Sequence, residues 1–301
     1  MKYKGKCVEV VPHIPEEIIL RIRNAQKEAG ADITVIEIGG TVGEYQNILF
    51  LEAIREMKLS HPKDVAVVLV SYLPVPKHIG EMKTKPTQYA ARSLNSAGLH
   101  ADIIVARGEF ELDGPRREKV AMFCGIAKDA CVSAPDVSSI YEIPIKMEEQ
   151  DLGNKLLRVL DLRPRKSVLT DWVSLNKRIV IAKKEVRIAV VGKYFGTGSY
   201  TLADSYISVI EAMKHASWSL GVKPILEWID SESFEKDPAA LSSLQTFDGV
   251  LVPGGFGTRG IEGIIAAIGY ARMHNIPYFG LCYGMQLACV EFARTVLHKK
   301  D

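Results

Sequence analysis

The chain has 301 residues, a length typical of two domains that each bury a hydrophobic core. Hydrophobic residues make up 47% and charged residues 25% of it, which is the composition of a globular protein and excludes collagen, coiled coils and disordered chains. Thirty-eight Lys and Arg oppose 36 Asp and Glu, and the net charge of +2 excludes a global attraction to nucleic acid or anionic membranes. Any anion site must therefore be local.

The apolar runs, the N-terminus and the cysteines predict a cytoplasmic protein. No apolar run is long enough to span a membrane, and the opening MKYKGKCVEVVPHIPEE lacks the apolar core of a signal peptide. Five scattered cysteines without a CxxC pair predict free thiols rather than a disulfide framework or a zinc site. They are Cys7, Cys124, Cys131, Cys282 and Cys289.

The first half of the chain alternates short β-branched runs with amphipathic stretches, the pattern of βαβ units around a parallel sheet. It predicts strands at 33–38, 65–72 and 103–106 and helices at 47–59 and 87–97. Residues 151–184 carry many charges and no clear strand. We interpret them as a linker between a first domain at 1–150 and a second at 185–301.

The second half repeats this alternation and predicts a second α/β domain. Four strands are predicted, at 186–191, 223–228, 248–252 and 276–281. Two helices are predicted between them, at 202–218 and 261–273.

Residues 275–294, NIPYFGLCYGMQLACVEFAR, contain the most informative motif. A predicted apolar strand leads into Gly280. The residues Gly280, Cys282 and Gly284 follow one another at intervals of two positions, and a helix-compatible run begins at Met285. This G-x-C-x-G spacing matches a nucleophile elbow, in which glycines permit a tight turn that exposes the nucleophile. A helix N-terminus just beyond it would stabilise the thiolate. Cys282 is therefore either a nucleophile or a small buried residue beside a glycine-permitted turn.

A glycine loop, DGVLVPGGFGTRG at 248–260, follows another predicted strand. Its Gly254 and Gly255 could bring a backbone N–H close to a developing oxyanion, so that two strand ends would face one pocket. Residues 255–260 also satisfy G-x-G-x-x-G. Pro253 and the lack of a following ribose-binding acid argue against a dinucleotide site.

Two loops of the first half have phosphate-binding character. EIGGTVG, residues 37–43, places Glu37 after a predicted strand and before a glycine turn, where α/β sheets often hold metals and phosphates; the alternative is a turn with an exposed acid. GEMKTKPTQ, residues 80–88, combines two lysines with a helix start predicted near Thr87, although lysine-rich loops are often only solvated.

These segments together resemble the CTP synthase family. VPGGFGTRGIEG and GLCYGMQ resemble its class I glutamine amidotransferase domain, and EIGGTVG and GEMKTKPTQ resemble its synthetase domain. The resemblance runs from VVPHIPEE through SSIYEIP to the elbow, which is nearly the whole chain. It implies an α/β fold with two doubly wound parallel-sheet domains, a P-loop-type synthetase (amidoligase) domain and a glutamine amidotransferase domain, both incomplete.

The resemblance implies roles for particular residues. Cys282 would attack the glutamine amide and form a thioester. The oxyanion donors and glutamine pocket would comprise Gly255, Tyr283, Gly284, Met285 and Gln286. UTP would bind Lys83, Thr84, Lys85, Pro86, Thr87, Gln88 and Lys119. The ATP adenine would lie against Pro135, Asp136 and Val137, and Mg²⁺ would bind Glu37. CTP would inhibit at Glu44, Tyr45 and Gln46, where the family usually shows Asp-Ile-Glu.

The implied reaction is the ATP-dependent amination of UTP to CTP with ammonia from L-glutamine, catalysed by a homotetramer with GTP as a candidate activator. Only His298 follows Cys282, and no G-x-x-x-x-G-K-[ST] loop occurs in the 301 residues. We therefore expect a fragment that is inactive in isolation. The alternatives are a non-catalytic UTP- or CTP-binding or assembly module and a stand-alone cysteine hydrolase.

Overall fold

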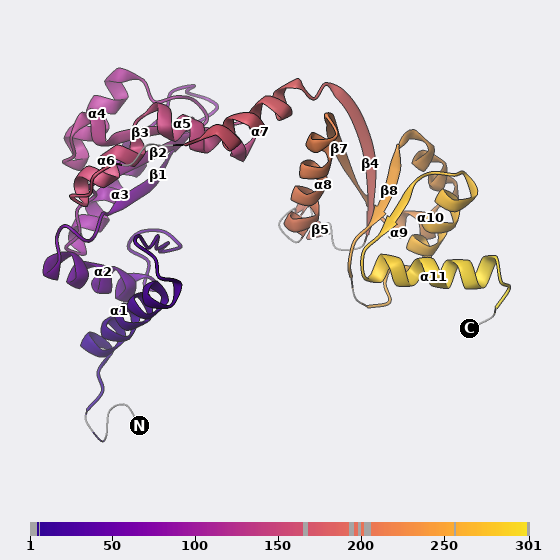
Figure 1. Ribbon diagram of the computed structural model, residues 1–301, viewed down its shortest axis with the longest axis horizontal. Coiled ribbons are helices and arrows are strands. Elements are labelled where there is room, and N and C mark those ends of the chain that lie inside the picture. The colour runs from indigo at the N-terminus through magenta and orange to yellow at the C-terminus, as the bar shows by residue number, and fades with distance from the viewer. Residues whose placement is uncertain are drawn as a thin grey trace. The chain divides into compact units, whose positions relative to one another are not determined.

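The computed structural model describes residues 5, 7–164, 168–192, 196–197, 200–201, 206–255 and 257–299. The chain divides into two compact units, Met1–Val173 and Ser174–Asp301, and each contains its own parallel sheet (Figure 1). The predicted α/β class is therefore confirmed. No helix in the described ranges is long and apolar enough to cross a membrane. All five cysteines are free thiols.

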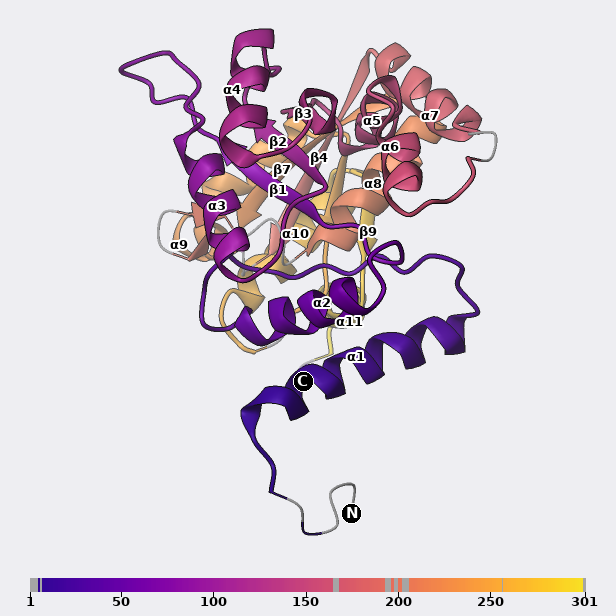
Figure 2. The same ribbon diagram turned by 90° about the vertical axis from the view of Figure 1, so that its left-hand side faces the viewer.

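The first unit is built on three parallel strands in the order β1-β2-β3: β1 (Val68–Leu73), β2 (Ile103–Gly108) and β3 (Cys131–Pro135). Leu73 lies opposite Gly108, and Gly108 lies opposite Pro135, so the three carboxyl ends share one edge of the sheet. The helices of this unit are α1 (Val10–Ala29), α2 (Ile48–Ser60), α3 (Lys85–Ser96), α4 (Gly114–Cys124), α5 (Ile143–Glu149) and α6 (Leu152–Val159). Helices α1 and α2 lie side by side (Figures 1 and 2).

The core of this unit forms on one face of the sheet. Leu69 of β1 and Ile104 of β2 pack with Leu94 of α3. Alternate β1 side chains point the other way, and there Val70 and Tyr72 are 61% and 55% exposed. One face of β1 is therefore bare among the described residues.

Two expectations for the first unit are wrong. Residues 33–38 form an irregular segment that pairs with no described strand, and Val35 is 93% exposed. A β-branched run without a partner strand cannot satisfy its backbone groups in a ladder. Helix α3 begins at Lys85 rather than near Thr87, because Pro86 is compatible with a first helical turn, where no intrahelical N–H bond is required.

The residues predicted as a linker, 151–184, contain α6 and α7 (Thr170–Ile181), so this segment is largely helical. The second unit has four parallel strands in the order β7-β4-β8-β9: β4 (Lys184–Gly192), β7 (Val222–Asp230), β8 (Gly249–Val252) and β9 (Tyr278–Gly280). All four predicted strands are confirmed. A small hairpin joins β5 (Gly196–Thr197) and β6 (Tyr200–Thr201).

Helices cover both faces of the second sheet. They are α8 (Ile207–Ser219), α9 (Glu232–Lys236), α10 (Ile261–Met273) and α11 (Tyr283–Thr295). Ala189 and Val191 of β4 share a core with α10, whereas Val190 packs against α8. The predicted helix at 261–273 is confirmed; that at 202–218 is observed from Ile207, and residues 202–205 lie outside the described residues. The strand order reverses between β4 and β8, and ligands of such sheets bind at the carboxyl ends of strands near this reversal.

Candidate functional site

Cys282 occupies a strained turn between β9 and α11. Its backbone has φ 50° and ψ −100°, and it is the residue that precedes the first turn of α11. A Cβ at Gly280 would lie 2.5 Å from the carbonyl carbon of Gly284, and one at Gly284 would lie 2.4 Å from the oxygen of Val252. Only glycine fits at these two positions. The turn therefore has the backbone geometry of a nucleophile elbow, and the role of Cys282 stays a prediction.

The elbow presents the Cys282 side chain to solvent, because this cysteine is exposed while Gly284 is buried. The carbonyl of Cys282 accepts a hydrogen bond from the Gln286 N–H at 3.1 Å, which starts helix α11. Exposure and position together fit a nucleophile and exclude the alternative of a small buried residue.

The glycine loop after β8 lies against the same cysteine. A Cβ at Gly254 would lie 3.7 Å from the Cβ of Cys282. Gly255 is half-buried, and Phe256 lies outside the described residues. The two strand ends therefore meet, as expected from the sequence. Of the remaining glutamine-pocket residues, Met285 and Gln286 are exposed and Tyr283 is half-buried.

Three tyrosine hydroxyls hold the backbone around this site, and two of them, those of Tyr206 and Tyr278, are not predicted from the sequence. Tyr278 donates to the carbonyl of Gly284 at 2.7 Å, and burial raises the pKa of Tyr278. Tyr206 donates to Gly254 at 3.3 Å, and Tyr283 donates to the carbonyl of Gly257 at 3.1 Å. No sequence signal marks Tyr206 or Tyr278, because a hydrogen bond to a backbone carbonyl requires no particular residue type at the accepting position.

The histidines upstream of the elbow are held by their own helices. The Nδ1 atom of His274 lies 2.9 Å from the carbonyl oxygen of Tyr270, and the two rings stack at 3.9 Å. His215 packs against Trp218 with ring centroids 5.8 Å apart.

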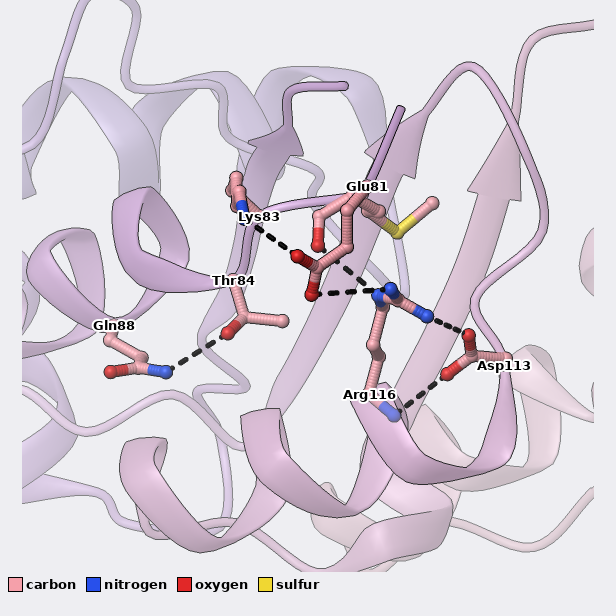
Figure 3. Close-up of polar contacts among 7 residues, drawn as sticks. Glu81, Lys83, Thr84, Gln88, Asp113 and Arg116 are labelled. Atoms are coloured by element: carbon pink, nitrogen blue, oxygen red, sulfur yellow. Dashed lines mark hydrogen bonds and ion pairs between the residues drawn. The ribbon is translucent and has the colours of Figure 1, made fainter. Parts of the chain in front are cut away.

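In the first unit, the GEMKTKPTQ segment connects β1 to α3 at the carboxyl edge of the sheet. Lys83 N–H donates to the carbonyl of Pro74, directly after β1, at 2.9 Å. Arg116 of α4 donates through Nε to the carbonyl of Met82 at 3.1 Å (Figure 3). The loop is therefore held by both the strand before it and the helix after β2.

The predicted UTP-binding residues of this segment differ in exposure. Thr84, Thr87 and Gln88 are buried: Thr87 accepts a hydrogen bond from the hydroxyl of Ser71 at 2.9 Å, and Gln88 donates to the hydroxyl of Thr84 at 3.1 Å. Lys83 is half-buried, whereas Lys85, Pro86 and Lys119 are exposed. The buried three position the loop, and the lysines are the groups that a ligand can reach.

The predicted ATP-binding residues lie at the same edge of the sheet. Pro135 ends β3, and the N–H of Asp136 donates to the carbonyl of Gly108 at 2.8 Å. Arg107 lies 3.5 Å from the Asp136 carboxylate. Since parallel strands place their carboxyl ends together, residues 80–84, Pro135 and Asp136 share this edge.

Comparison with known families decides the assignment. The family model described as the CTP synthase N-terminus matches residues 1–162. The chain belongs to the CTP synthase family. A second model, glutamine amidotransferase class-I, matches residues 201–301, which include the elbow.

Curated relatives named CTP synthase agree with this assignment. The chain is 44% identical over 299 residues to that of Methanococcoides burtonii, 45% over 300 to that of Carboxydothermus hydrogenoformans and 46% over 303 to that of Saccharolobus solfataricus. These alignments cover 98%, 99% and 98% of the chain but 54%, 55% and 55% of the relatives. The chain thus spans about half the length of the curated relatives that it matches.

A solved structure, the glutaminase domain of a Trypanosoma brucei CTPS with bound acivicin, is 44% identical to the chain. The matched region covers 37% of this chain and 42% of the chain in that structure, with a TM-score of 0.34.

The residues that CTP synthase family membership suggests for metal and inhibitor lie in loops. Glu37 is exposed and follows no strand, contrary to the prediction, and borders a mostly apolar cavity of about 210 Å³ between α1 and α2. No group of three or more acidic, histidine or cysteine side chains suited to a metal occurs among the described residues. Glu37 alone does not form a magnesium site, since a lone carboxylate would leave the ion to water and nucleotide phosphates.

The 44–46 segment is accessible to a ligand. Glu44, Tyr45 and Gln46 are all exposed, and Tyr45 is 95% exposed. Asn47 holds the turn before them by donating to the carbonyl of Thr41 at 2.7 Å. The assignment of this segment to CTP inhibition stays a prediction.

Proposed function

We propose that this chain contributes the glutamine-hydrolysing elbow and the UTP-binding loop of a CTP synthase, a carbon–nitrogen ligase. The reaction is the amination of UTP to CTP, driven by ATP and supplied with ammonia from L-glutamine. The observation that carries the proposal is the position of Cys282, exposed at the start of α11 with the Gly254 loop against it. Family membership supports the same reaction.

In the glutaminase step, the Cys282 thiolate attacks the side-chain amide carbon of glutamine. The backbone N–H groups of Gly255 and Tyr283 stabilise the oxyanion, and Gly284, Met285 and Gln286 line the pocket. The carbon–nitrogen bond then breaks, ammonia leaves with a proton, and a thioester remains on sulfur. Water hydrolyses the thioester to glutamate and restores the thiol.

In the synthetase step, ATP phosphorylates the 4-oxygen of UTP, and ammonia displaces the phosphate to give CTP. Lys83, Lys85 and Lys119 neutralise the UTP triphosphate, because lysine ammonium groups bind phosphate as mobile point charges. The ATP adenine lies against residues 135–137, and Glu37 would contribute one carboxylate to a Mg²⁺ ion that neutralises phosphate charge. The 301 residues contain no P-loop motif, and only His298 follows Cys282 as a candidate general base. The 301-residue chain alone therefore does not complete the synthesis.

The regulatory and assembly features of the family complete the proposal. CTP inhibits at residues 44–46, where Gln46 replaces a usual carboxylate and weakens this contact. GTP is a candidate activator of glutamine hydrolysis. The protein acts as a homotetramer in the cytoplasm.

A chloroketone analogue of glutamine tests the glutaminase half. We expect one equivalent of label on Cys282, protection by free glutamine and complete loss in Cys282→Ala. Cys289→Ala is the matched control, because Cys289 is also exposed and lies on the same helix. Labelling of Cys289 in preference to Cys282, or no protection by glutamine, would overturn the assignment of Cys282.

UTP calorimetry tests the other half on the same chain. Binding of UTP without any labelling of Cys282 would favour the non-catalytic nucleotide-binding module instead. Unchanged UTP binding in Lys85→Ala would remove this lysine from the proposed site.

A further inference from the structure

The carboxylate of Glu81 lies between two cations at the nucleotide loop, Lys83 and Arg116 (Figure 3). Lys83 Nζ donates to its Oε2 atom at 2.7 Å, and Arg116 Nη2 lies 3.4 Å from its Oε1 atom. The side chains of Glu81, Lys83 and Arg116 are 53%, 36% and 27% exposed, so the cluster is open to solvent on the carboxylate side. A ligand can reach it without opening the core.

The charges around Glu81 are mostly positive. The hydrogen bond from Lys83 lowers the pKa of Glu81, and the charges of Lys83, Arg116 and Lys119 lower it further. Lys83 and Lys119 are two of the proposed UTP-binding residues, whereas no sequence motif indicated Arg116. All three cations therefore act on the space that the Glu81 carboxylate occupies.

Arg116 is held in place independently of Glu81. Its Nε donates to the carbonyl of Met82 at 3.1 Å, and its guanidinium also pairs with Asp113. Asp113 is itself fixed, because its carboxylate accepts the Arg116 backbone N–H at 2.8 Å as the N-cap of α4. Departure of Glu81 would thus leave Arg116 oriented.

We propose that Glu81 is an internal counter-ion in the place of a phosphate group, and that the triphosphate of UTP displaces it from Lys83 and Arg116. The inference rests on the proposed function and adds Arg116 as a third cation of the site. A phosphate group offers more negative charge and more acceptor oxygens than a carboxylate, so it binds the two cations more tightly than Glu81 does. Since Arg116 is already oriented, its side chain loses little entropy on binding.

Exchange has a measurable consequence, because the ligand must break the Glu81–Lys83 pair. Exposed ion pairs are weak, so Glu81→Gln should bind UTP only about two- to fivefold more tightly. The gain should also appear with inorganic triphosphate and be absent with uridine. Arg116→Gln should bind both phosphates about tenfold more weakly, the loss typical of one charge-assisted hydrogen bond.

The experiment is calorimetry on the full chain at fixed ionic strength. Glu118→Gln is the matched control, because Glu118 lies on the helix that carries Arg116 and the substitution removes the same charge from an exposed pair with Lys128. We expect that control to bind both phosphates like the parent chain. Equal or weaker UTP binding by Glu81→Gln, or an equal gain in Glu118→Gln, would overturn the inference.

Inorganic triphosphate separates the two proposals. If the parent chain binds triphosphate with the expected order of variants but shows no preference for UTP, the counter-ion exchange holds and the UTP assignment fails. If UTP binds and neither Glu81→Gln nor Arg116→Gln changes its affinity, the UTP assignment holds and the exchange fails. A circular-dichroism spectrum and thermal scan of each variant confirm that the fold is retained.

Discussion

The elbow and the nucleotide loop both follow parallel strands, but they are built from different parts of the chain. The elbow is defined by backbone atoms: Gly280 and Gly284 leave no room for a Cβ. The nucleotide loop instead presents side chains, since the charged groups of Glu81, Lys83 and Arg116 meet at its exposed side. We therefore expect the elbow to be sensitive to volume and the loop to be sensitive to charge and ionic strength.

Thiol reactivity should show the largest difference between the units. Burial raises the pKa of Cys131 to about 11, so at pH 8 only about one molecule in a thousand carries this thiolate. Cys282 is exposed at a helix N-terminus. With iodoacetamide followed by mass spectrometry, we expect Cys282 to react at least about 100-fold faster than Cys131.

Raising the pH should increase labelling of Cys131, because deprotonation of a thiol with a raised pKa occurs at higher pH. Urea should equalise the two cysteines. Equal rates in the native protein at pH 8 would contradict the exposed elbow.

Gly284→Ala tests the sensitivity of the elbow to volume. Its new Cβ would lie 2.4 Å from the oxygen of Val252, and backbone must move to relieve this contact. We expect the free energy of unfolding of the second unit to fall by about 3 kcal/mol, measured by urea denaturation. Gly114→Ala is the control, because nothing lies within 4 Å of its Cβ. Similar losses in both variants would show that the close contact does not matter.

The Arg272–Glu291 pair between α10 and α11 tests the support behind the elbow. Arg272 Nη2 donates to Glu291 at 2.8 Å; the Glu291 side chain is 2% and that of Arg272 38% exposed. Glu291→Gln should cost about 2 kcal/mol, less than a fully buried pair, because Arg272 is partly solvated. Glu262→Gln, which removes a 67% exposed partner of Arg294, should cost under about 1 kcal/mol.

The same pair predicts the direction of an acid effect. Hydrogen bonding to Arg272 lowers the pKa of Glu291 below its model-compound value of 4.5. The stabilisation is therefore present above pH 4.5 and is lost as the pH falls through the folded-state pKa. Urea titrations from pH 7 to 3 should show a shallower acid loss in Glu291→Gln than in the parent chain. An identical slope would exclude this carboxylate as a source of acid sensitivity.

Asp113 gives the smallest effect. Asp113→Ala removes the N-cap of α4 and should lower stability by about 1 kcal/mol, measured by urea denaturation. Asp113→Asn keeps a capping oxygen and should lose less. Equal losses of stability in the two variants would indicate that the ion pair between Asp113 and Arg116 contributes more than the helix cap.

Much of the fold could be predicted from sequence. Strands such as 248–252 and 276–281 were found because their apolar runs are short, buried and bounded by glycine or proline. The strand predicted at 33–38 does not form, because β-branched composition is a local property whereas a strand needs a partner. The start of α3 was misplaced because Thr87, a plausible cap by composition, is buried against Ser71.

The sequence by itself determined the elbow, since the glycine spacing around Cys282 encodes a steric requirement of the backbone, which is local. Only the tertiary structure decided that Gly254 meets Cys282, that tyrosine hydroxyls hold this turn, and that Arg116 joins Lys83 around Glu81. Arg116 lies 33 positions from Lys83 and 35 from Glu81, and no local pattern records such a contact. Charges separated along the chain interact only after the sheet has brought the carboxyl ends of its strands together.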